Sequence, residues 1–247
     1  MDKITHIYHD GFVAELEEQV LIFDWYTGKL PQFDTGKKVT VFVSHSHRDH
    51  YGEIIFSLMD ICPDLVYVTD RKVRVKKETA DRLGKSRLVR VSAGDDAEVH
   101  GLRIHAFRST DIGVAFLAEA GDKLYFHAGD LNIWYWEGEA DADNRWQAGT
   151  YRSEIDKLER MLGGRHLEAA FLPLDPRLEA HAPDGMLYFL SHIPVRHVYP
   201  MHYWDDEEKM KRYLELPELK KYADVIAEPS LQASDLRSGQ PAASRDI

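Results

Sequence analysis

Three histidines and an aspartate lie within the segment "HSHRDH", residues 45 to 50. This segment directly follows "KKVTVFVS" (37–44), a β-branched run typical of a strand buried on both faces. Titratable side chains at the end of such a strand need partners, because burying them alone costs free energy. An exposed polar loop is the alternative, but imidazole and carboxylate at this spacing are typical metal ligands. The segment therefore predicts a metal site.

The spacing within this segment divides the donors between two ions. Residues two apart in an extended chain point the same way, so His45 and His47 can reach one ion. The chain then turns into "RDHYGEIIFSLMDIC", which has helical spacing, so Asp49 and His50 can face the same cavity from another side. Pairs of ions about 3.5–4 Å apart are a known hydrolytic arrangement. We expect one or two ions here.

The single cysteine, Cys62, limits what can hold such an ion. An internal disulfide and a thiolate cage are both excluded for this chain. Histidine and carboxylate must supply the ligands. This donor set predicts a divalent cation, with Zn²⁺ expected first and Mn²⁺ or Fe²⁺ as alternatives.

The motif resembles the His-x-His-x-Asp-His signature of the metallo-β-lactamase fold superfamily. Three further motifs match in the expected order along the chain: Asp24 in "LIFDWY" before this segment, and Asp130 in "FHAGDLN" and His202 in "VYPMHYW" after it. The resemblance implies that Asp24 buttresses the metal loop, that Asp130 bridges two ions and that His202 completes one site. It also implies an αββα sandwich: two mixed β-sheets face to face, outer helices, and the metal site at one edge.

One motif departs from this pattern. Where the superfamily usually supplies another histidine, the chain reads "FRSTDIGVAF" (107–116). Asp111 is the preferred substitute, since a carboxylate oxygen binds the same ions; a turn or cap role for Asp111 and a ligand role for His105 stay open. One expected ligand set is Asp49, His50, Asp130 and His202. The other is His45, His47 and Asp130, joined by Asp111.

The segments between these motifs predict the sheets that position them. Residues 3–24 are typical of two or three short strands, and residues 37–94 of a β-α-β-α-β alternation with a helix over 71–84. Successive strands follow from 98 to 127, then a helix at about 150–162 and two strands around a helix over 185–193. We predict a single domain over 1–228 and a disordered tail over 229–247, which is poor in large apolar residues.

Several other residues are candidates for the site. His127 is a candidate catalytic acid or substrate contact, with packing in the sheet as the alternative, and Asp49 can also orient the attacking water. His9 is either at the cavity mouth or an ordinary turn residue. The aromatic segment 133–146 is a substrate wall, a homo-oligomer contact or a local hydrophobic cluster. Arg177 suits an anionic substrate group or a surface salt bridge.

Charge and hydropathy narrow the partners. A net charge of −11 argues against broad affinity for nucleic acid or anionic membranes, which both require a positive field. The apolar runs are too short to span a bilayer and the first residues have no signal-peptide core, which predicts a cytoplasmic protein without a membrane partner.

These observations predict a metal-dependent hydrolase. We expect a metal-bound hydroxide to attack a small ester, lactone or phosphoester, and the chain is most similar to the short lactonase-like members of the superfamily. A phosphodiesterase or nuclease is one alternative, although the inserted domain or arm of the superfamily's RNA-processing members has no room between these motifs. A non-catalytic ligand-binding or sensing module with a partial metal site is the other.

Overall fold

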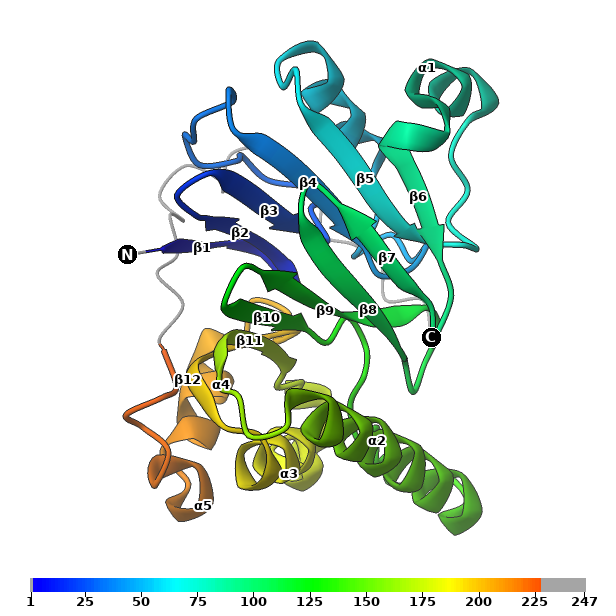
Figure 1. Cartoon of the computed structure of the whole chain (residues 1–247). Helices are drawn as coiled ribbons and strands as arrows, with labels where there is room; N and C mark the ends of the chain where they lie inside the picture. The colour runs from blue at the N-terminus through cyan, green and yellow to red at the C-terminus, as the bar shows by residue number, and fades with distance from the viewer. Residues whose placement is uncertain (1, 228–247) are drawn as a thin grey trace.

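Two six-stranded sheets face each other in this computed structural model, which describes residues 2–227 (Figure 1). The first sheet has the order β1-β2-β3-β4-β5-β6 and the second β12-β11-β10-β9-β8-β7. The strands of the first sheet are β1 (Lys3–Tyr8), β2 (Gly11–Glu15), β3 (Gln19–Phe23), β4 (Lys38–Val43), β5 (Leu65–Asp70) and β6 (Leu88–Val91). Those of the second are β7 (Asp96–Val99), β8 (Leu102–Arg108), β9 (Val114–Ala120), β10 (Lys123–His127), β11 (Leu167–Pro173) and β12 (Val195–Met201).

Helices cover the outer face of each sheet. The 3-10 helix η1 (Glu53–Asp60) and α1 (Lys77–Arg87) pack on the first sheet, and α2 (Asp141–Leu162) and α3 (Asp184–His192) lie along the second (Figure 1). The shorter η2 (Pro176–His181), α4 (Glu207–Leu214) and α5 (Pro217–Lys220) complete the described chain. Both sheets are mixed, since β1 to β3 and β7 to β10 pair antiparallel and the remaining neighbours pair parallel. The predicted αββα sandwich is confirmed.

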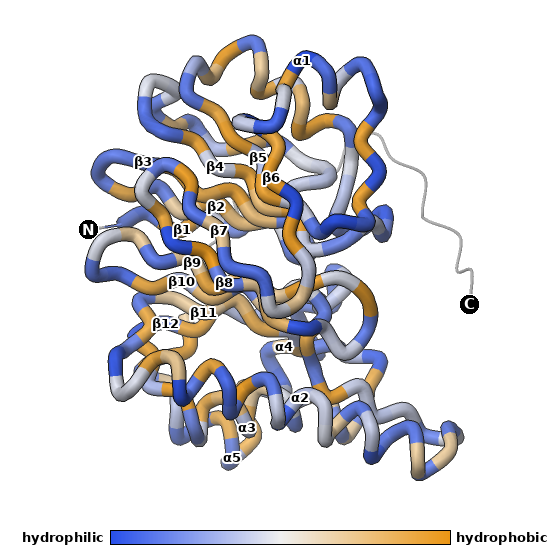
Figure 2. Tube along the Cα trace, turned by 45° about the vertical axis from the view of Figure 1, so that its right-hand side comes forward, coloured by the Kyte–Doolittle hydropathy of each residue, from blue (hydrophilic) through white to orange (hydrophobic). Residues whose placement is uncertain are grey.

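The main core lies between the two sheets. Alternate residues of each strand turn inward, and aromatic rings meet across the interface: Phe12 lies 4.4 Å from Phe171, and Phe42 lies 5.2 Å from Phe116, between ring centroids. All four are fully buried. Figure 2 shows hydrophobic residues concentrated along the strands and hydrophilic residues in many of the connecting loops. Burial of this apolar surface holds the sheets in one relative position.

Two helices begin at residues other than predicted. The helix expected over 71–84 begins at Lys77, because the preceding residues bond elsewhere: Arg71 N donates to the Val91 carbonyl and Lys72 N to the Asp70 side chain. The helix expected from about 150 begins at Asp141, where acidic side chains in the first turn favour a helix start. The predicted tail 229–247 lies outside the described residues. None of the helices within 2–227 is long and apolar enough to cross a membrane.

The strand ends that matter for function meet at one edge. β4 runs parallel to β3 and β5, and β10, β11 and β12 run parallel to one another, so the residues that follow each of them emerge on the same side of their sheet. The glycine at 113 lets the β8–β9 connection approach the residues after β4. A Cβ on Gly113 would lie 2.2 Å from the Ser44 carbonyl oxygen and 2.5 Å from His45 Cβ.

Replacing Gly113 should therefore lower the free energy of unfolding by more than its left-handed backbone conformation alone explains. Gly113 has φ +77° and Gly121 has φ +63°, but a Cβ on Gly121 meets nothing within 4 Å. We expect Gly121→Ala to lower the free energy of unfolding by about 1–2 kcal/mol, the cost of a left-handed residue, and Gly113→Ala to lower it by clearly more. Urea denaturation of both variants measures the difference, and equal losses would contradict the close approach.

Candidate metal centre

Imidazoles and carboxylates from four parts of the chain converge at this sheet edge. They come from the β1–β2 turn and from the segments after β4, β10 and β12. Two groups of side chains each offer donor atoms within 4.8 Å of one another. The first donor group is His9, Asp10, His50 and His202, and the second donor group is His45, His47 and Asp130. All of these except His47 are buried.

The Asp130 carboxylate lies between the two groups. Its Oδ1 is 3.2 Å from His50 Nε2 and 3.5 Å from His202 Nε2. Its Oδ2 is 3.2 Å from His45 Nε2. One carboxylate thus faces imidazoles of both donor groups, which is the position that a bridging ligand requires.

A second carboxylate, Asp24, orients the metal loop, residues 44–50. Asp24 Oδ1 accepts a hydrogen bond from Ser44 N at 2.8 Å, and Oδ2 accepts from Ser44 Oγ at 2.5 Å and from His50 Nδ1 at 2.9 Å. His50 Nε2 is therefore turned toward Asp10 and Asp130, at 3.1 and 3.2 Å. Carboxylates that bind the second nitrogen of a ligand histidine fix its ring and raise its basicity. Asp24 is placed to do this for His50.

Asp175, which follows β11, holds His202 in the same way. His202 Nδ1 lies 3.0 Å from Asp175 Oδ2, so Nε2 faces Asp10 and Asp130. Asp175 has no exposed surface. His50 and His202, the predicted ligands that lie in the first donor group, thus each have a buried carboxylate bonded to their other ring nitrogen.

The buried donor atoms of these groups fit a cation. Within residues 2–227, five buried atoms lie near one another but form no hydrogen bond of suitable geometry: His9 Nε2, both Asp10 oxygens, His50 Nε2 and Asp130 Oδ1. Buried polar atoms rarely remain unpaired in folded proteins. Because these atoms converge and are nitrogen and carboxylate oxygen, a divalent ion satisfies them together. The residues present therefore match the metal that the sequence predicts.

The carboxylates of the cluster stabilise the charged forms of the histidines that face them. Burial opposes the charged form of His50, but the carboxylates of Asp130 and Asp10 raise its pKa well above the usual value. Burial likewise opposes charge on His202, yet Asp10 and Asp175 raise its pKa to about 9. Burial raises the pKa of Asp10 to about 8. A bound cation would take the place of these protons, since ligand imidazoles must be deprotonated.

Two predicted acidic ligands lie at the rim of the cluster. Asp49 Oδ2 is 3.6 Å from His9 Nε2, and Asp49 belongs to neither donor group. Asp111 Oδ2 is 3.7 Å from His47 Nδ1, and its side chain is 47% exposed, so it can swing toward the second donor group. His105 instead contacts Asp96 at 2.5 Å. The structure brings Asp111, and not His105, beside His47 of the second donor group.

His127 is engaged in the protein interior. Its Nε2 donates to the Asp10 carbonyl at 2.9 Å and its Nδ1 accepts from Gly129 N at 3.1 Å. The ring has no exposed surface and stacks on Phe23 with centroids 5.0 Å apart. With both nitrogens occupied, His127 fixes the backbone beside the cluster and makes no contact with the pocket. This position gives the predicted catalytic role of His127 no support.

Asp10 is a residue of the cluster that the sequence did not indicate, and His9 was expected only at the cavity mouth or as an ordinary turn residue. They form the turn between β1 and β2, and His9 adopts φ +53°, which is unfavourable for a non-glycine residue. The only local signal is the turn "HDG" itself. Turn residues of this kind are common. Whether they approach the metal loop depends on how β1 and β2 join the edge of the first sheet.

A pocket of about 510 Å³ opens onto the cluster. Metal-loop and donor residues line one part of it, and Trp134, Trp136, Trp204 and Arg177 line another. The aromatic segment 133–146 is thus divided: Trp134 and Trp136 face this pocket, whereas Trp146 lies on α2 and is 52% exposed. A homo-oligomer contact through this segment stays a prediction.

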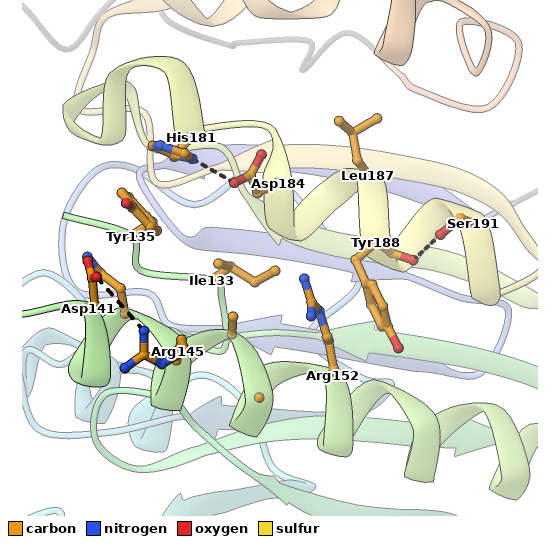
Figure 3. Close-up of a pocket in the computed structure, with 13 residues that line it drawn as sticks. Ile133, Tyr135, Asp141, Arg145, Arg152, His181, Asp184, Leu187, Tyr188 and Ser191 are labelled. Carbon is orange, nitrogen blue, oxygen red and sulfur yellow. Dashed lines mark hydrogen bonds and ion pairs between the residues drawn. The ribbon is translucent and has the colours of Figure 1, made fainter. Parts of the chain in front are cut away.

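A larger groove, of about 910 Å³, lies between α2 and α3 (Figure 3). His181 and Asp184 pair on one side of it, and Arg152 lies over the Tyr188 ring on the other. None of its lining residues belongs to either donor group. Chemistry is therefore assigned to the smaller pocket, despite the greater volume of the groove.

Comparison with known proteins agrees with this geometry. No protein-family model matches the chain. A protein of Cereibacter sphaeroides named UPF0173 metal-dependent hydrolase is 27% identical over 173 residues, which cover 62% of this chain and 70% of that protein. Igni18, a metallo hydrolase of Ignicoccus hospitalis, superposes with a TM-score of 0.58 at 15% identity over 92% of this chain and 95% of its own.

A third comparison gives the fold its name. The metallo-β-lactamase fold protein YhfI of Bacillus subtilis superposes with a TM-score of 0.50 at 9% identity, over 92% of this chain and 94% of its own. The chain has the metallo-β-lactamase fold. The sequence relative is named a metal-dependent hydrolase, and the two donor groups of this chain could each hold a metal ion.

Asp24 provides a test of how this metallo-β-lactamase fold holds its ligands. Asp24→Asn keeps the shape but weakens the hold on Ser44 and His50, so metal affinity should fall about 10- to 100-fold, as for other outer carboxylates behind ligand histidines. Asp122→Asn, in an exposed turn, is the matched control and should bind metal like the unmodified protein. Titration with Zn²⁺ in competition with a chelator measures both. Unchanged affinity in Asp24→Asn would show that the buttress is dispensable.

Asp111 provides a test of the second donor group. If its carboxylate joins His45, His47 and Asp130, Asp111→Ala should weaken binding of one of two metal equivalents and leave the other unchanged. Stoichiometry by elemental analysis after dialysis against graded free Zn²⁺ resolves the two steps, with Asp122→Ala as the control. Two equivalents bound as tightly as in the unmodified protein would leave Asp111 as a turn residue, bonded through its N–H to Ser109 Oγ.

Proposed function

We propose that this chain hydrolyses a small ester, lactone or phosphoester at the two donor groups. The observation that supports this proposal is the buried Asp130 carboxylate, which faces imidazoles of both groups where they open into a pocket. Hydrolytic two-metal sites share a ligand in this manner. The relative from Cereibacter sphaeroides is named a metal-dependent hydrolase, which supports the same reaction class.

The first donor group would hold one ion, and the second, with Asp111 beside it, would hold another. A bound divalent ion supplies Lewis acidity and lowers the pKa of water to about 7. We expect Zn²⁺ because histidine nitrogen dominates both groups, with Mn²⁺ or Fe²⁺ as the alternatives that added carboxylates favour.

The chain's own side chains would bind and orient the substrate. Asp49 lines the pocket at the rim of the first donor group, where its partly exposed carboxylate can accept a hydrogen bond from water and so orient it. The indoles of Trp134, Trp136 and Trp204 provide a wall against which an apolar part of the substrate can pack. Asp24 and Asp175 keep the His50 and His202 rings in place and so preserve the geometry of the site.

The pocket favours a small molecule over a nucleic acid. Its volume, about 510 Å³, lies within the range of about 300–1,000 Å³ typical of small-ligand sites. Tryptophans form much of its wall, and among the described residues that line it Arg48 and Arg177 are the arginines, with no lysine beside them. A nuclease would need an extended basic groove to follow a phosphate backbone.

Metal content and activity measured together test the proposal. We expect purified protein to hold divalent metal and to hydrolyse at least one class in a screen of esters, lactones and phosphodiesters, with activity lost to a chelator and restored by Zn²⁺ or Mn²⁺. His50→Ala should lose metal and lower kcat/KM more than about 100-fold, beyond the loss typical of an outer carboxylate. His197→Ala, on the exposed part of β12, is the matched control.

The same measurements separate the alternative roles. Cleavage of phosphodiesters alone would favour a phosphodiesterase. The hydrolase would be contradicted if the purified protein held no metal and hydrolysed no substrate in the screen, and if the His50→Ala variant folded as well as the unmodified protein. That result would favour a binding or sensing module.

A further inference from the structure

Arg177 lies in the pocket in an unusually fixed position. Its Nε lies 3.0 Å from both Asp175 oxygens, and its Nη2 donates to Asp175 Oδ2 at 2.6 Å. The guanidinium carbon lies 4.5 Å from the centroid of the Trp204 ring and 5.5 Å from that of Trp136. The carboxylate holds one edge of the guanidinium, and the two indoles contribute cation–π contacts.

The remaining edge of this guanidinium is free for a ligand. Among residues 2–227 the Nη1 group has no hydrogen-bond partner, and the side chain is 48% exposed while lining the pocket. A guanidinium that served only to neutralise Asp175 would need just the edge already in use. Held in one orientation, its free donors lose little freedom when they bind a carboxylate or phosphate oxygen.

Asp175 also connects this arginine to the metal centre. Its Oδ2 receives hydrogen bonds from His202 Nδ1 at 3.0 Å, from Trp204 Nε1 at 3.2 Å and from Arg177. Asp175 is fully buried, so these three partners are fixed relative to one another. Arg177 and the donor residues Asp130 and His202 line the same pocket. A group bound to Arg177 therefore lies in the same space as the bond to be cleaved.

We propose that Arg177 binds an anionic group of the substrate, a carboxylate or a phosphate, beside the metal centre. This inference rests on the proposed function and assigns it a substrate class: an ester or lactone that carries a negative charge away from the scissile bond. Arg177 selects the substrate and takes no part in bond cleavage. Its loss should therefore weaken binding of anionic substrates with little change in turnover.

Two 4-nitrophenyl esters, one with a carboxylate group on its acyl chain and one without, test this assignment. We expect Arg177→Gln to raise KM for 4-nitrophenyl hemisuccinate roughly 10- to 100-fold, the loss of a charge-assisted hydrogen bond, with kcat nearly unchanged. KM for neutral 4-nitrophenyl acetate should stay the same. Arg177→Lys keeps the charge without the fork and should be intermediate. Arg152→Gln, which loses an arginine over the Tyr188 ring in the other groove, is the matched control.

A binding measurement tests the assignment independently of turnover. Metal-loaded protein is titrated with succinate and, separately, with inorganic phosphate, and tryptophan fluorescence reports binding because indoles flank Arg177. We expect Arg177→Gln to weaken at least one anion roughly 10- to 100-fold and Arg152→Gln to weaken neither. The anion affected identifies the group as carboxylate or phosphate.

The outcomes separate this inference from the proposed function. Anion binding lost in Arg177→Gln, in protein that hydrolyses nothing, would support the anchor and contradict the hydrolase. Equal affinities in Arg177→Gln and the unmodified protein, or no binding of either anion, would overturn the anchor. Equal losses for neutral and charged esters, accompanied by lower metal content, would also overturn it and leave Arg177 as a structural partner of Asp175.

Discussion

The Asp130 carboxylate, buried against the imidazoles of His45, His50 and His202, imposes the main constraint on this molecule. A carboxylate in the interior is tolerated only when opposite charge and hydrogen-bond donors surround it. Those donors come from segments after different strands, so the strands must end at one edge and keep their relative positions. Asp24 and Asp175 extend the same requirement outward, because each holds a histidine whose other nitrogen faces Asp130.

The sandwich meets this requirement through its interior strands. β4 lies between β3 and β5, and β10 lies between β9 and β11, so both have neighbours on either side. The contact of Phe42 with Phe116 sets the sheets face to face just below the metal loop. Gly113 permits the β8–β9 connection to reach Ser44. Residues that end such supported strands are held more rigidly than residues on free loops, which suits ligands that must keep a fixed geometry.

Some of the site was predictable because its signals are local or ordered. The ligand spacing within "HSHRDH" can be read from the sequence. Asp24, Asp130 and His202 occur along the chain in the order that the resemblance to the superfamily predicts. The fold followed from the strand patterns of the sequence, although α2 begins at Asp141, earlier than the predicted start at about residue 150. Arg177 was visible as a residue after a strand, but its clamp of two indoles and a carboxylate depends on segments distant in the sequence.

Other parts of the site form only when segments distant in the sequence pack together, and the residues around them contain no specific motif. His9 and Asp10 reach the cluster only because β1 and β2 add to the edge of the first sheet. Period-two alternation could not decide whether His127 faces the pocket or the core, and its partners are backbone groups of Asp10 and Gly129. Asp111 lies next to His47, but its side chain is half-exposed, so few neighbouring atoms restrict its position.

The most direct test of the account is the position of metal itself, located by anomalous diffraction from crystals grown with Zn²⁺. The account predicts an ion bound about 2.0–2.2 Å from His50 Nε2 and His202 Nε2, with Asp130 as a ligand that also faces the site of His45 and His47. Ions found only on surface histidines, with Asp130 hydrogen-bonded to protonated imidazoles and no metal beside it, would contradict it.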